Sequence, residues 1–313
     1  MDLTPFLDPL EKLHDCDLCP RECTADRFSE DLGYCKSNAS FCISSICIHH
    51  GEEPAISGEE GICNLFFAHC NLQCIYCQNY QISDNRLAVS SDAMELEEVI
   101  RQVSGFLDAG ITRVGFVSPS HFIPQVMIII RCIESLGYKP VWVYNSNGYD
   151  KPSTLRLLEG MIDVYLPDLK YMESTLAGEY SDAPDYPEMA SMALKEMFRQ
   201  KGAVLHTGKE GTAESGIIIR HLVLPGHAGN SLKVINFIAE ELSPKIHVSL
   251  MSQYYPTLMV SCHPVLQNKV SPEEYATVVN EMERLGMENG WIQELSSADH
   301  YRPDFEKDQP FGR

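Results

Sequence analysis

The sequence has no long apolar run and no recognisable export signal, and both absences narrow its class. No apolar stretch reaches the roughly 18 residues that a membrane-spanning helix needs. The longest candidate, "VMIIIRCI" (126–133), is interrupted by Arg131 and fits a buried helix. The N-terminus lacks the basic and then apolar pattern of a secretory signal. We therefore expect a cytoplasmic protein.

Positive charge is also scarce. The chain has 24 Lys and Arg against 44 Asp and Glu, which gives a net charge of −20 at pH 7. Proteins that bind nucleic acid normally carry basic patches, and anionic membrane surfaces attract the same kind of patch. The charge therefore argues against both a nucleic-acid partner and a membrane partner.

Cysteine, in contrast, is abundant and concentrated at one end. Ten of the 12 cysteines fall in the first 77 residues, and only Cys132 and Cys262 lie beyond them. A reducing compartment disfavours a disulfide framework, so the cluster indicates metal binding. Cys132 lies in an apolar segment and is predicted to be a small buried hydrophobic residue.

The sequence pattern changes near residue 60, from a cysteine-rich segment to alternating strand and helix patterns. We expect residues 1–60 to form a small cysteine-rich module stapled by metal, and residues 61–313 to form a second domain with a C-terminal helix. In that second part, strand patterns alternate with helix patterns. The predicted strands are 62–67, 113–118, 140–145, 161–167, 216–226 and 245–251, with a short closing strand at 291–295; the helices are 94–110, 121–137, 153–160, 188–202, 231–243 and 271–286.

Six strands that alternate with helices imply a parallel sheet with right-handed crossovers. A partial (β/α)6 barrel and an open doubly wound sheet both fit this pattern. No G-x-G-x-x-G follows the first strand, which weakens the dinucleotide-binding version. Functional groups of a parallel barrel lie at the carboxyl ends of its strands, and a cysteine loop follows the first strand at that edge.

That loop, "AHCNLQCIYCQNYQIS" (68–83), holds Cys70, Cys74 and Cys77 in a C-x3-C-x2-C spacing. Structural zinc needs four ligands, and His69 is badly placed to be the fourth. Three thiolates suit a [4Fe–4S] cubane with one open iron, which can chelate an amino-acid cofactor. Zinc and free thiols remain the alternatives.

This motif, with the aromatic Tyr76 before the last cysteine, resembles that of the radical S-adenosylmethionine (SAM) superfamily. Further segments resemble its pyruvate formate-lyase-activating-enzyme-like members. These segments are "HHGEEPAISGEEG" (49–61), "VSPSHFIPQV" (117–126), "VYNSNGYD" (143–150), "VYLPDLKY" (164–171) and "HLVLPG" (221–226). The resemblance covers most of the chain from residue 16 to about residue 260.

The resemblance implies a partial (β/α)6 TIM-like barrel and an oxidoreductase. A [4Fe–4S] cluster on Cys70, Cys74 and Cys77 would reductively cleave SAM to methionine and a 5′-deoxyadenosyl radical, which abstracts hydrogen from a substrate. By analogy with activating enzymes, the substrate would be a glycyl residue of a partner glycyl radical enzyme, and a flavodoxin or ferredoxin would donate the electron. Radical modification of another peptide or small molecule is the alternative, followed by a non-catalytic zinc or iron–sulfur protein.

The resemblance also implies cofactor contacts. Tyr76 would pack beside the base of SAM, and "SPSH" stands where the family normally has Gly-Gly-Glu-Pro. The candidate contacts are Tyr76, Ser118, Ser120, His121, Asn145, Ser146, Asn147, Asp168 and Lys170. For the Asn-Gly and Pro-Asp segments, ordinary turn chemistry is the alternative interpretation, and Lys170 is alternatively a solvated surface charge.

A second cysteine set precedes the motif. Cys16, Cys19, Cys23 and Cys35 are four thiolates, which permits a closed zinc site or a fully ligated auxiliary iron–sulfur cluster. Cys42 and Cys47 could replace members of this set. Between the two sets, His49, His50, Glu52 and Glu53 either face the active-site mouth or form a hydrogen-bonded packing loop, and we favour the packing role.

Overall fold

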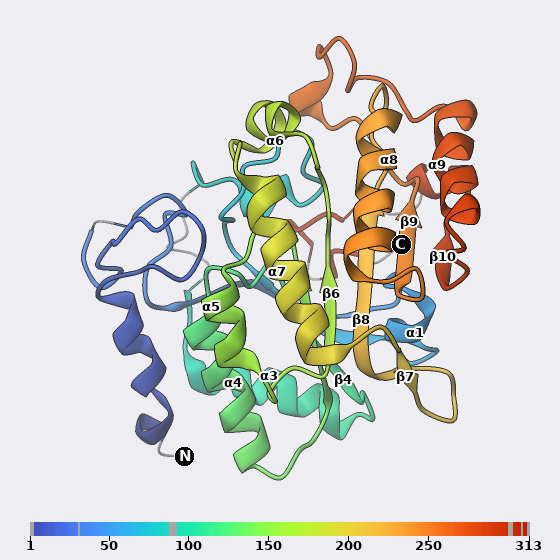
Figure 1. Cartoon of the computed structure of the whole chain (residues 1–313). Coiled ribbons are helices and arrows are strands. Elements are labelled where there is room, and N and C mark those ends of the chain that lie inside the picture. The colour runs from blue at the N-terminus through green and yellow to red at the C-terminus, as the bar shows by residue number, and fades with distance from the viewer. Residues whose placement is uncertain (1–2, 31, 88–92, 300–302, 308, 312–313) are drawn as a thin grey trace.

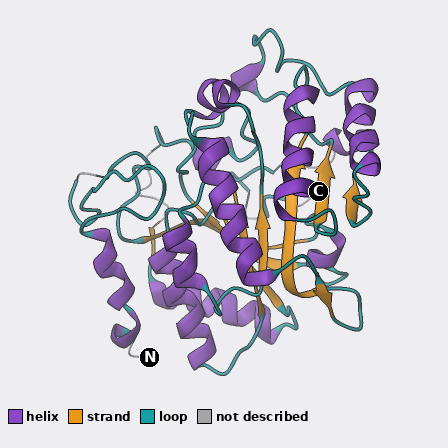
Figure 2. Ribbon diagram, viewed as in Figure 1, coloured by secondary structure: helices purple, strands orange, loops and turns teal. Residues whose placement is uncertain are grey.

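A computed structural model describes residues 3–30, 32–87, 93–299, 303–307 and 309–311. Its described residues form a ten-stranded sheet with helices outside it (Figures 1 and 2). The strands are β1 (Phe41–His49), β2 (Ile62–Phe67), β3 (Ala93–Met94), β4 (Arg113–Val117), β5 (Val141–Ser146), β6 (Val164–Pro167), β7 (His206–Thr207), β8 (Ala213–Leu222), β9 (His247–Met251) and β10 (Gly290–Ile292).

The helices occur between these strands. They are α1 (Pro54–Ser57), α2 (Tyr80–Ser83), α3 (Leu96–Asp108), α4 (Ile123–Ser135), α5 (Pro152–Leu155), α6 (Ser174–Ser181), α7 (Tyr186–Lys201), α8 (Ala228–Phe237) and α9 (Pro272–Arg284). Helix α9 begins with a capping box, in which Ser271 and Glu274 satisfy each other's backbone N–H groups. Within the described residues, no helix has both the length and the apolar character needed to cross a membrane.

The strand order distinguishes the two architectures that the sequence left open. Strands β2, β4, β5, β6, β8 and β9 are parallel neighbours in chain order, and β10 extends them in parallel. A doubly wound sheet reverses its strand order at a switch point, whereas this order never reverses. Because successive strands are added in one direction, their right-handed crossover connections place the helices on one face of the sheet. Figure 1 shows α4, α5, α7, α8 and α9 on that face. The partial (β/α)6 barrel is therefore confirmed.

The barrel strands are buried because helices cover them on the outside and side chains cover them on the inside. Every residue of β2, β4 and β6 is buried, as expected for strands covered on both sides. Gly115 on β4 leaves room for Asn64 of β2, whose Oδ1 would lie 2.1 Å from an added Cβ. The interior of the barrel is thus partly polar.

The N-terminal 60 residues contribute to the same sheet. β1 pairs antiparallel with β2 along its length, and its first residues pair with β3. Arg27 anchors the segment before β1, because its buried guanidinium donates to the carbonyls of Ser37 and Asn38 at 2.8 Å and to that of His121. The predicted domain boundary at residue 60 stays a prediction. Strand β1, which precedes that boundary, pairs with β2, which follows it.

Candidate metal and cofactor site

The three cysteines of the motif lie in the loop after β2, at the carboxyl edge of the sheet. Asn85 fixes this loop, since its side chain accepts from the Cys70 N–H at 3.1 Å and donates to the Cys70 carbonyl at 3.0 Å. His69 does not complete the set. Its two ring nitrogens lie 2.8 and 3.0 Å from the carbonyl oxygens of Cys35 and Leu87.

Each of the three sulfur atoms accepts a hydrogen bond from a different side chain. Asn147 donates to Cys70 Sγ at 3.2 Å, Ser181 donates to Cys74 Sγ at 2.9 Å, and Ser83 donates to Cys77 Sγ at 3.2 Å. The Leu72 N–H also lies 3.4 Å from Cys70 Sγ. Donors of this kind stabilise thiolates and tune iron–sulfur clusters. The donor set therefore fits a cluster held by three thiolates.

Burial controls the protonation of these groups when no metal is bound. It raises the pKa of Cys70 to about 12 and that of Cys74 to about 11, and the nearby Lys170 ammonium opposes the shift at Cys74. Both groups are therefore thiols at neutral pH until a metal displaces their protons. Among the described residues, no three His, Cys, Asp or Glu side chains converge on a single metal ion. A cubane does not need such convergence, because each thiolate binds a different iron.

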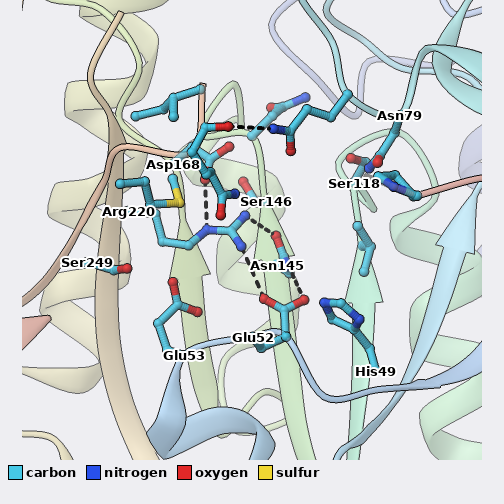
Figure 3. Close-up of a pocket in the computed structure, with 18 of the residues that line it drawn as sticks. His49, Glu52, Glu53, Asn79, Ser118, Asn145, Ser146, Asp168, Arg220 and Ser249 are labelled. Atoms are coloured by element: carbon cyan, nitrogen blue, oxygen red, sulfur yellow. Dashed lines mark hydrogen bonds and ion pairs between the residues drawn. The ribbon is translucent and has the colours of Figure 1, made fainter. Parts of the chain in front are cut away.

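The three thiols open into a cavity of about 650 Å³ inside the barrel. Figure 3 shows part of its wall, with labelled side chains from β1, β5, β8 and β9, from the loop before α1, and from just after β4 and β6. Of the predicted cofactor contacts, this cavity is lined by Tyr76, Ser118, Asn145, Ser146, Asn147, Asp168 and Lys170. These residues come from four separate segments of the chain, one of which is the loop that carries Cys70, Cys74 and Cys77.

Ser120 and His121 are placed differently. Both are 1% exposed, and neither is among the described residues that line the cavity. The His121 ring lies against the backbone, with Nε2 3.1 Å from the Ala68 carbonyl. The structure therefore places these two side chains behind Ser118, where they pack the loop that carries it.

A buried ion-pair network crosses the cavity wall. Arg220 donates to Asp168 at 2.9 Å, to Glu52 at 3.2 Å and to Asn145 at 2.6 Å, and Lys170 lies 2.6 Å from Asp168 (Figure 3). Burial alone would raise the pKa of Asp168, but Arg220 and Lys170 lower it below its usual value. Asp168 is thus ionised, and Lys170 is a buried, paired cation and not a solvated surface charge.

The Asn147–Gly148 turn has a specific function in this arrangement. Gly148 has φ +82°, and an added Cβ would lie 2.1 Å from the Asp168 carbonyl oxygen. The Ser146 hydroxyl donates to Asp150 and accepts from the Gly148 N–H at 2.8 Å. Ser146 therefore stiffens the turn, and Asn147 presents its amide to Cys70. The Asn147–Gly148 segment is therefore both a turn and part of the wall of the cavity.

Tyr76 begins a chain of buried hydroxyl groups that leads back to the cysteines. Its hydroxyl lies 2.6 Å from that of Tyr171, which lies 2.8 Å from the hydroxyl of Ser181. Ser181 in turn donates to Cys74. This chain fixes the Tyr76 ring at the cavity wall, where the prediction places the base of the cofactor.

The second cysteine set lies in the N-terminal loops. Burial raises the pKa of Cys19 to about 12, and the neighbouring Cys35, Cys16 and Cys23 add to this shift. Residues beside these cysteines adopt the left-handed conformation, with φ 41° at Glu22, 50° at Thr24 and 52° at Lys36. The described side chains do not converge on one ion, so zinc and an auxiliary cluster both stay predictions. Cys47 lies apart on β1, packed with Phe66 and Val117.

Sequence reasoning missed Arg220, which organises the cavity wall. Its signal was present, since it is the charged residue in the apolar strand pattern "GIIIRHLVL" (216–224). The loop at 49–53 does more than the packing that we favoured, because Glu52 pairs with Arg220 inside the barrel. Ser83 and Ser181 were also missed, and nothing in the sequence distinguishes these two serines from others.

Part of the chain matches a known protein family. Residues 56–180 match the family described as "4Fe-4S single cluster domain" (Fer4_12). This segment contains Cys70, Cys74 and Cys77 and excludes the N-terminal set.

Individual relatives follow. The chain is 26% identical over 281 residues to the protein MJ0674 of Methanocaldococcus jannaschii. The matched segment covers 87% of this chain and 75% of that protein. It is similar in fold to the hydrogenase maturase HydG from Carboxydothermus hydrogenoformans, with a TM-score of 0.48, 16% identity, and coverage of 75% and 53% of the two chains. Streptococcus suis SuiB bound to precursor peptide SuiA gives a TM-score of 0.47, 15% identity, and coverage of 74% and 48%.

Proposed function

We propose that the protein is a radical SAM enzyme whose [4Fe–4S] cluster is held by Cys70, Cys74 and Cys77. The observation that carries this proposal is the set of three buried thiols that share one cavity, each with its own hydrogen-bond donor. Three protein thiolates leave one iron of a cubane open for a chelating cofactor. The match of residues 56–180 to a 4Fe-4S single cluster domain supports the cluster.

The cluster and SAM, when bound, would supply a 5′-deoxyadenosyl radical that removes a hydrogen atom from a substrate. The chain's own residues bind, orient and shield. Asn147, Ser181 and Ser83 stabilise the thiolates. Ser118, Asn145, Asp168 and Lys170 give the cavity a polar wall of both charge signs, which suits the amine and carboxylate of an amino-acid cofactor. Tyr76 supplies an aromatic surface for its base.

For the substrate, the proposal follows the resemblance to activating enzymes. The hydrogen would come from a glycyl residue of a partner glycyl radical enzyme, and a flavodoxin or ferredoxin would supply the electron. The second candidate is radical modification of another peptide or of a small molecule. The favouring observation is the cavity of about 650 Å³, a size typical of small-ligand sites.

The central test is SAM cleavage. Protein reconstituted anaerobically with iron and sulfide should convert SAM to 5′-deoxyadenosine when dithionite is added, as measured by liquid chromatography. Cys70→Ala, Cys74→Ala and Cys77→Ala should each abolish this product, whereas Cys132→Ala, at a buried cysteine on α4, should retain it. Cleavage that survives in the three motif variants would contradict the proposal, as would a fully loaded cluster that cleaves no SAM.

The same preparation tests the N-terminal set of Cys16, Cys19, Cys23 and Cys35. Metal analysis should give about four irons plus one zinc per chain if this set binds zinc, and about eight irons if it binds a second cluster. A Cys19→Ala variant should lose only that second metal. About four irons and no zinc in the wild-type protein would contradict both forms of this proposal.

A further inference from the structure

Glu53 is a buried acidic side chain in the cavity that the proposed chemistry leaves unused. It directly precedes α1, and its backbone carbonyl accepts from the N–H groups of Ile56 and Ser57 at 2.7 and 3.0 Å. The residue is 8% exposed, and its side chain lines the same cavity as the three cysteine thiols. Figure 3 shows its carboxylate directed into that cavity, beside Ser249. These backbone hydrogen bonds fix the main chain of Glu53 at the start of α1.

Neither the arginine nor the lysine that lines the cavity, among the described residues, forms an ion pair with Glu53. Arg220 is bonded to Asp168, Glu52 and Asn145, and Lys170 is bonded to Asp168. His49, also on the wall, has its pKa lowered to about 4 by burial and by His50 and Arg220, so it is neutral at pH 7. Three carboxylates therefore face two cations. Burial raises the pKa of Glu53 even though Arg220 lies near enough to oppose this shift, so a ligand that brings a further positive charge would stabilise the ionised form of Glu53.

One oxygen of Glu53 also lacks a partner. Its Oε2 is buried and has no hydrogen-bond partner within the described part of the chain. Leaving such an atom unpaired is costly, because a buried charged group needs both a counter-ion and hydrogen bonds. An unpaired carboxylate oxygen that faces a cavity is satisfied by a ligand that brings a donor and a positive charge.

The position of Glu53 separates it from the proposed cofactor contacts. Figure 3 places Glu53 and Ser249 on one side of Arg220 and Asp168 on the other. Trp291 and Gln293, in and just after β10, line the cavity as well. A ligand that reached Glu53 would therefore occupy the part of the cavity bordered by β9 and β10, away from Asp168 and Lys170.

We propose that Glu53 binds a cationic nitrogen group, an ammonium or a guanidinium, of the substrate, and so selects a substrate with a basic group. Oε2 would accept a charge-assisted hydrogen bond, and the Trp291 side chain would border the alkyl part of the ligand. This inference rests on the proposed function for the identity of the ligand as a substrate. The binding of a cation at Glu53 is independent of cluster chemistry.

The test uses binding to the reconstituted holoenzyme with SAM present, measured by calorimetry at pH 7.5. The probes are N-acetyl-lysinamide, its uncharged analogue N-acetyl-norleucinamide, and the free amine agmatine. The wild-type protein should bind at least one of the two cations about tenfold or more tightly than norleucinamide. Tighter binding of lysinamide identifies a protein side chain as the source, and tighter binding of agmatine identifies a small molecule.

Two variants give the contrast. Glu53→Gln should lose the preference for the cation, whereas Glu59→Gln, at an exposed position six residues further along the chain, should keep it. The inference is overturned if wild-type protein shows no preference for either cation. It is also overturned if Glu53→Gln retains the preference for the cation, whether or not that variant binds SAM more weakly. A lack of cation preference in wild-type protein overturns the inference even if Glu53→Gln fails to fold.

Failure of this inference is distinguishable from failure of the proposed function. SAM cleavage with dithionite requires no added amine, so it reports on the function alone. Cleavage without cation preference removes the role of Glu53 and leaves the radical SAM proposal intact. Cation preference without SAM cleavage supports the role of Glu53 and contradicts the radical SAM proposal.

Discussion

At the scale of single residues, Arg220 determines the electrostatics of the cavity. Its side chain is 15% exposed and faces Glu52 and Asp168, each of which is also largely buried. Removing one partner of a buried ion pair leaves an uncompensated charge, which costs more than the pair contributes. The positive charge of Arg220 is therefore required by the two carboxylates, whichever ligand the cavity takes.

We expect Arg220→Met to lower the free energy of unfolding by about 3–5 kcal/mol, because two buried carboxylates lose their shared cation. Urea denaturation followed by circular dichroism measures this change. Adding Glu52→Gln should recover part of the loss. As a control, Arg284→Met removes an exposed pair with Glu281 and should barely move the denaturation midpoint. An equal effect of the two single variants would contradict the assigned role of Arg220.

The donors to sulfur act at the same scale. Hydrogen bonds to the sulfur ligands stabilise the more negative, reduced cluster and raise its reduction potential. Ser181 makes the shortest of these contacts, 2.9 Å to Cys74 Sγ. In the proposed enzyme, this side chain makes the cluster easier to reduce.

Ser181→Ala should therefore make the reduction potential of the cluster more negative. One hydrogen bond to a charged group is worth about 1.4 kcal/mol or somewhat more, which is on the order of 60 mV for one electron. A redox titration followed by electron paramagnetic resonance measures the shift. Ser191→Ala, which removes a helix serine bonded to the Pro187 carbonyl, is the control. A potential that is unchanged or more positive in Ser181→Ala would contradict the argument.

At the scale of elements, the turn after β5 shows how backbone geometry builds the site. Gly148 lies in the left-handed region, and the space that a side chain would need is filled by the Asp168 carbonyl and the Tyr186 hydroxyl. Tyr186 donates to the Asn147 carbonyl at 2.9 Å, so one contact region supports both β5 and β6. A change at Gly148 therefore moves Asn147 and Asp168 together.

Gly148→Ala should destabilise the protein by more than about 2 kcal/mol, since left-handed strain and a backbone clash add. It should also reduce the amount of iron bound at the Cys70 site. Gly160→Ala is a matched control, because Gly160 has φ +79° but nothing within 4 Å of the added Cβ. Thermal unfolding and iron analysis compare the two variants. Equal losses would show that strain alone, without the clash, explains the effect.

Much of the barrel could be predicted because its elements carry a local signal. The first strand was placed at 62–67, which agrees with β2, and the S-P-E-E start of the last helix became the capping box of α9. Strand β1 was missed, because "FCISSICIH" lies in a cysteine-rich region and is stabilised by its pairing with β2. Helix α6 was missed, because its surroundings, rich in Asp, Pro and Tyr, indicated a loop.

The residues of the site likewise divide into those that the sequence indicates and those that depend on tertiary packing. Residues at strand ends, such as Asn147 and Asp168, could be predicted because the segments that carry them resemble those of a known family. Ser120 and His121 belong to the same sequence segment as Ser118, whose φ is +54°, yet both are buried and neither lines the cavity. Ser181 reaches Cys74 across 107 residues of sequence. Such contacts depend on tertiary packing, which a local pattern does not encode.

At the scale of the whole molecule, buried neutral histidines link stability to pH. Burial lowers the pKa of His121 to about 3, helped by Arg27 and His69 and opposed by a hydrogen bond to the Ala68 carbonyl. Burial also lowers the pKa of His221 to about 4. Because an unfolded histidine has a pKa near 6.5, the unfolded chain binds more protons between these values. The stability contributed by each neutral ring is therefore complete above pH 6.5 and is lost as pH falls toward 3–4.

We expect His121 alone to account for a loss of about 2 kcal/mol in unfolding free energy between pH 7.5 and pH 5. Urea denaturation at several pH values should show a shallower pH dependence in His121→Gln than in wild-type protein. His206→Gln, at an exposed position on β7, should keep the wild-type slope. The comparison between variants cancels the contribution of carboxylates such as Asp168, which all three proteins share. Parallel slopes in wild-type protein and His121→Gln would mean that the buried ring accepts a proton without unfolding, and that the loop carrying Ser118 opens to water.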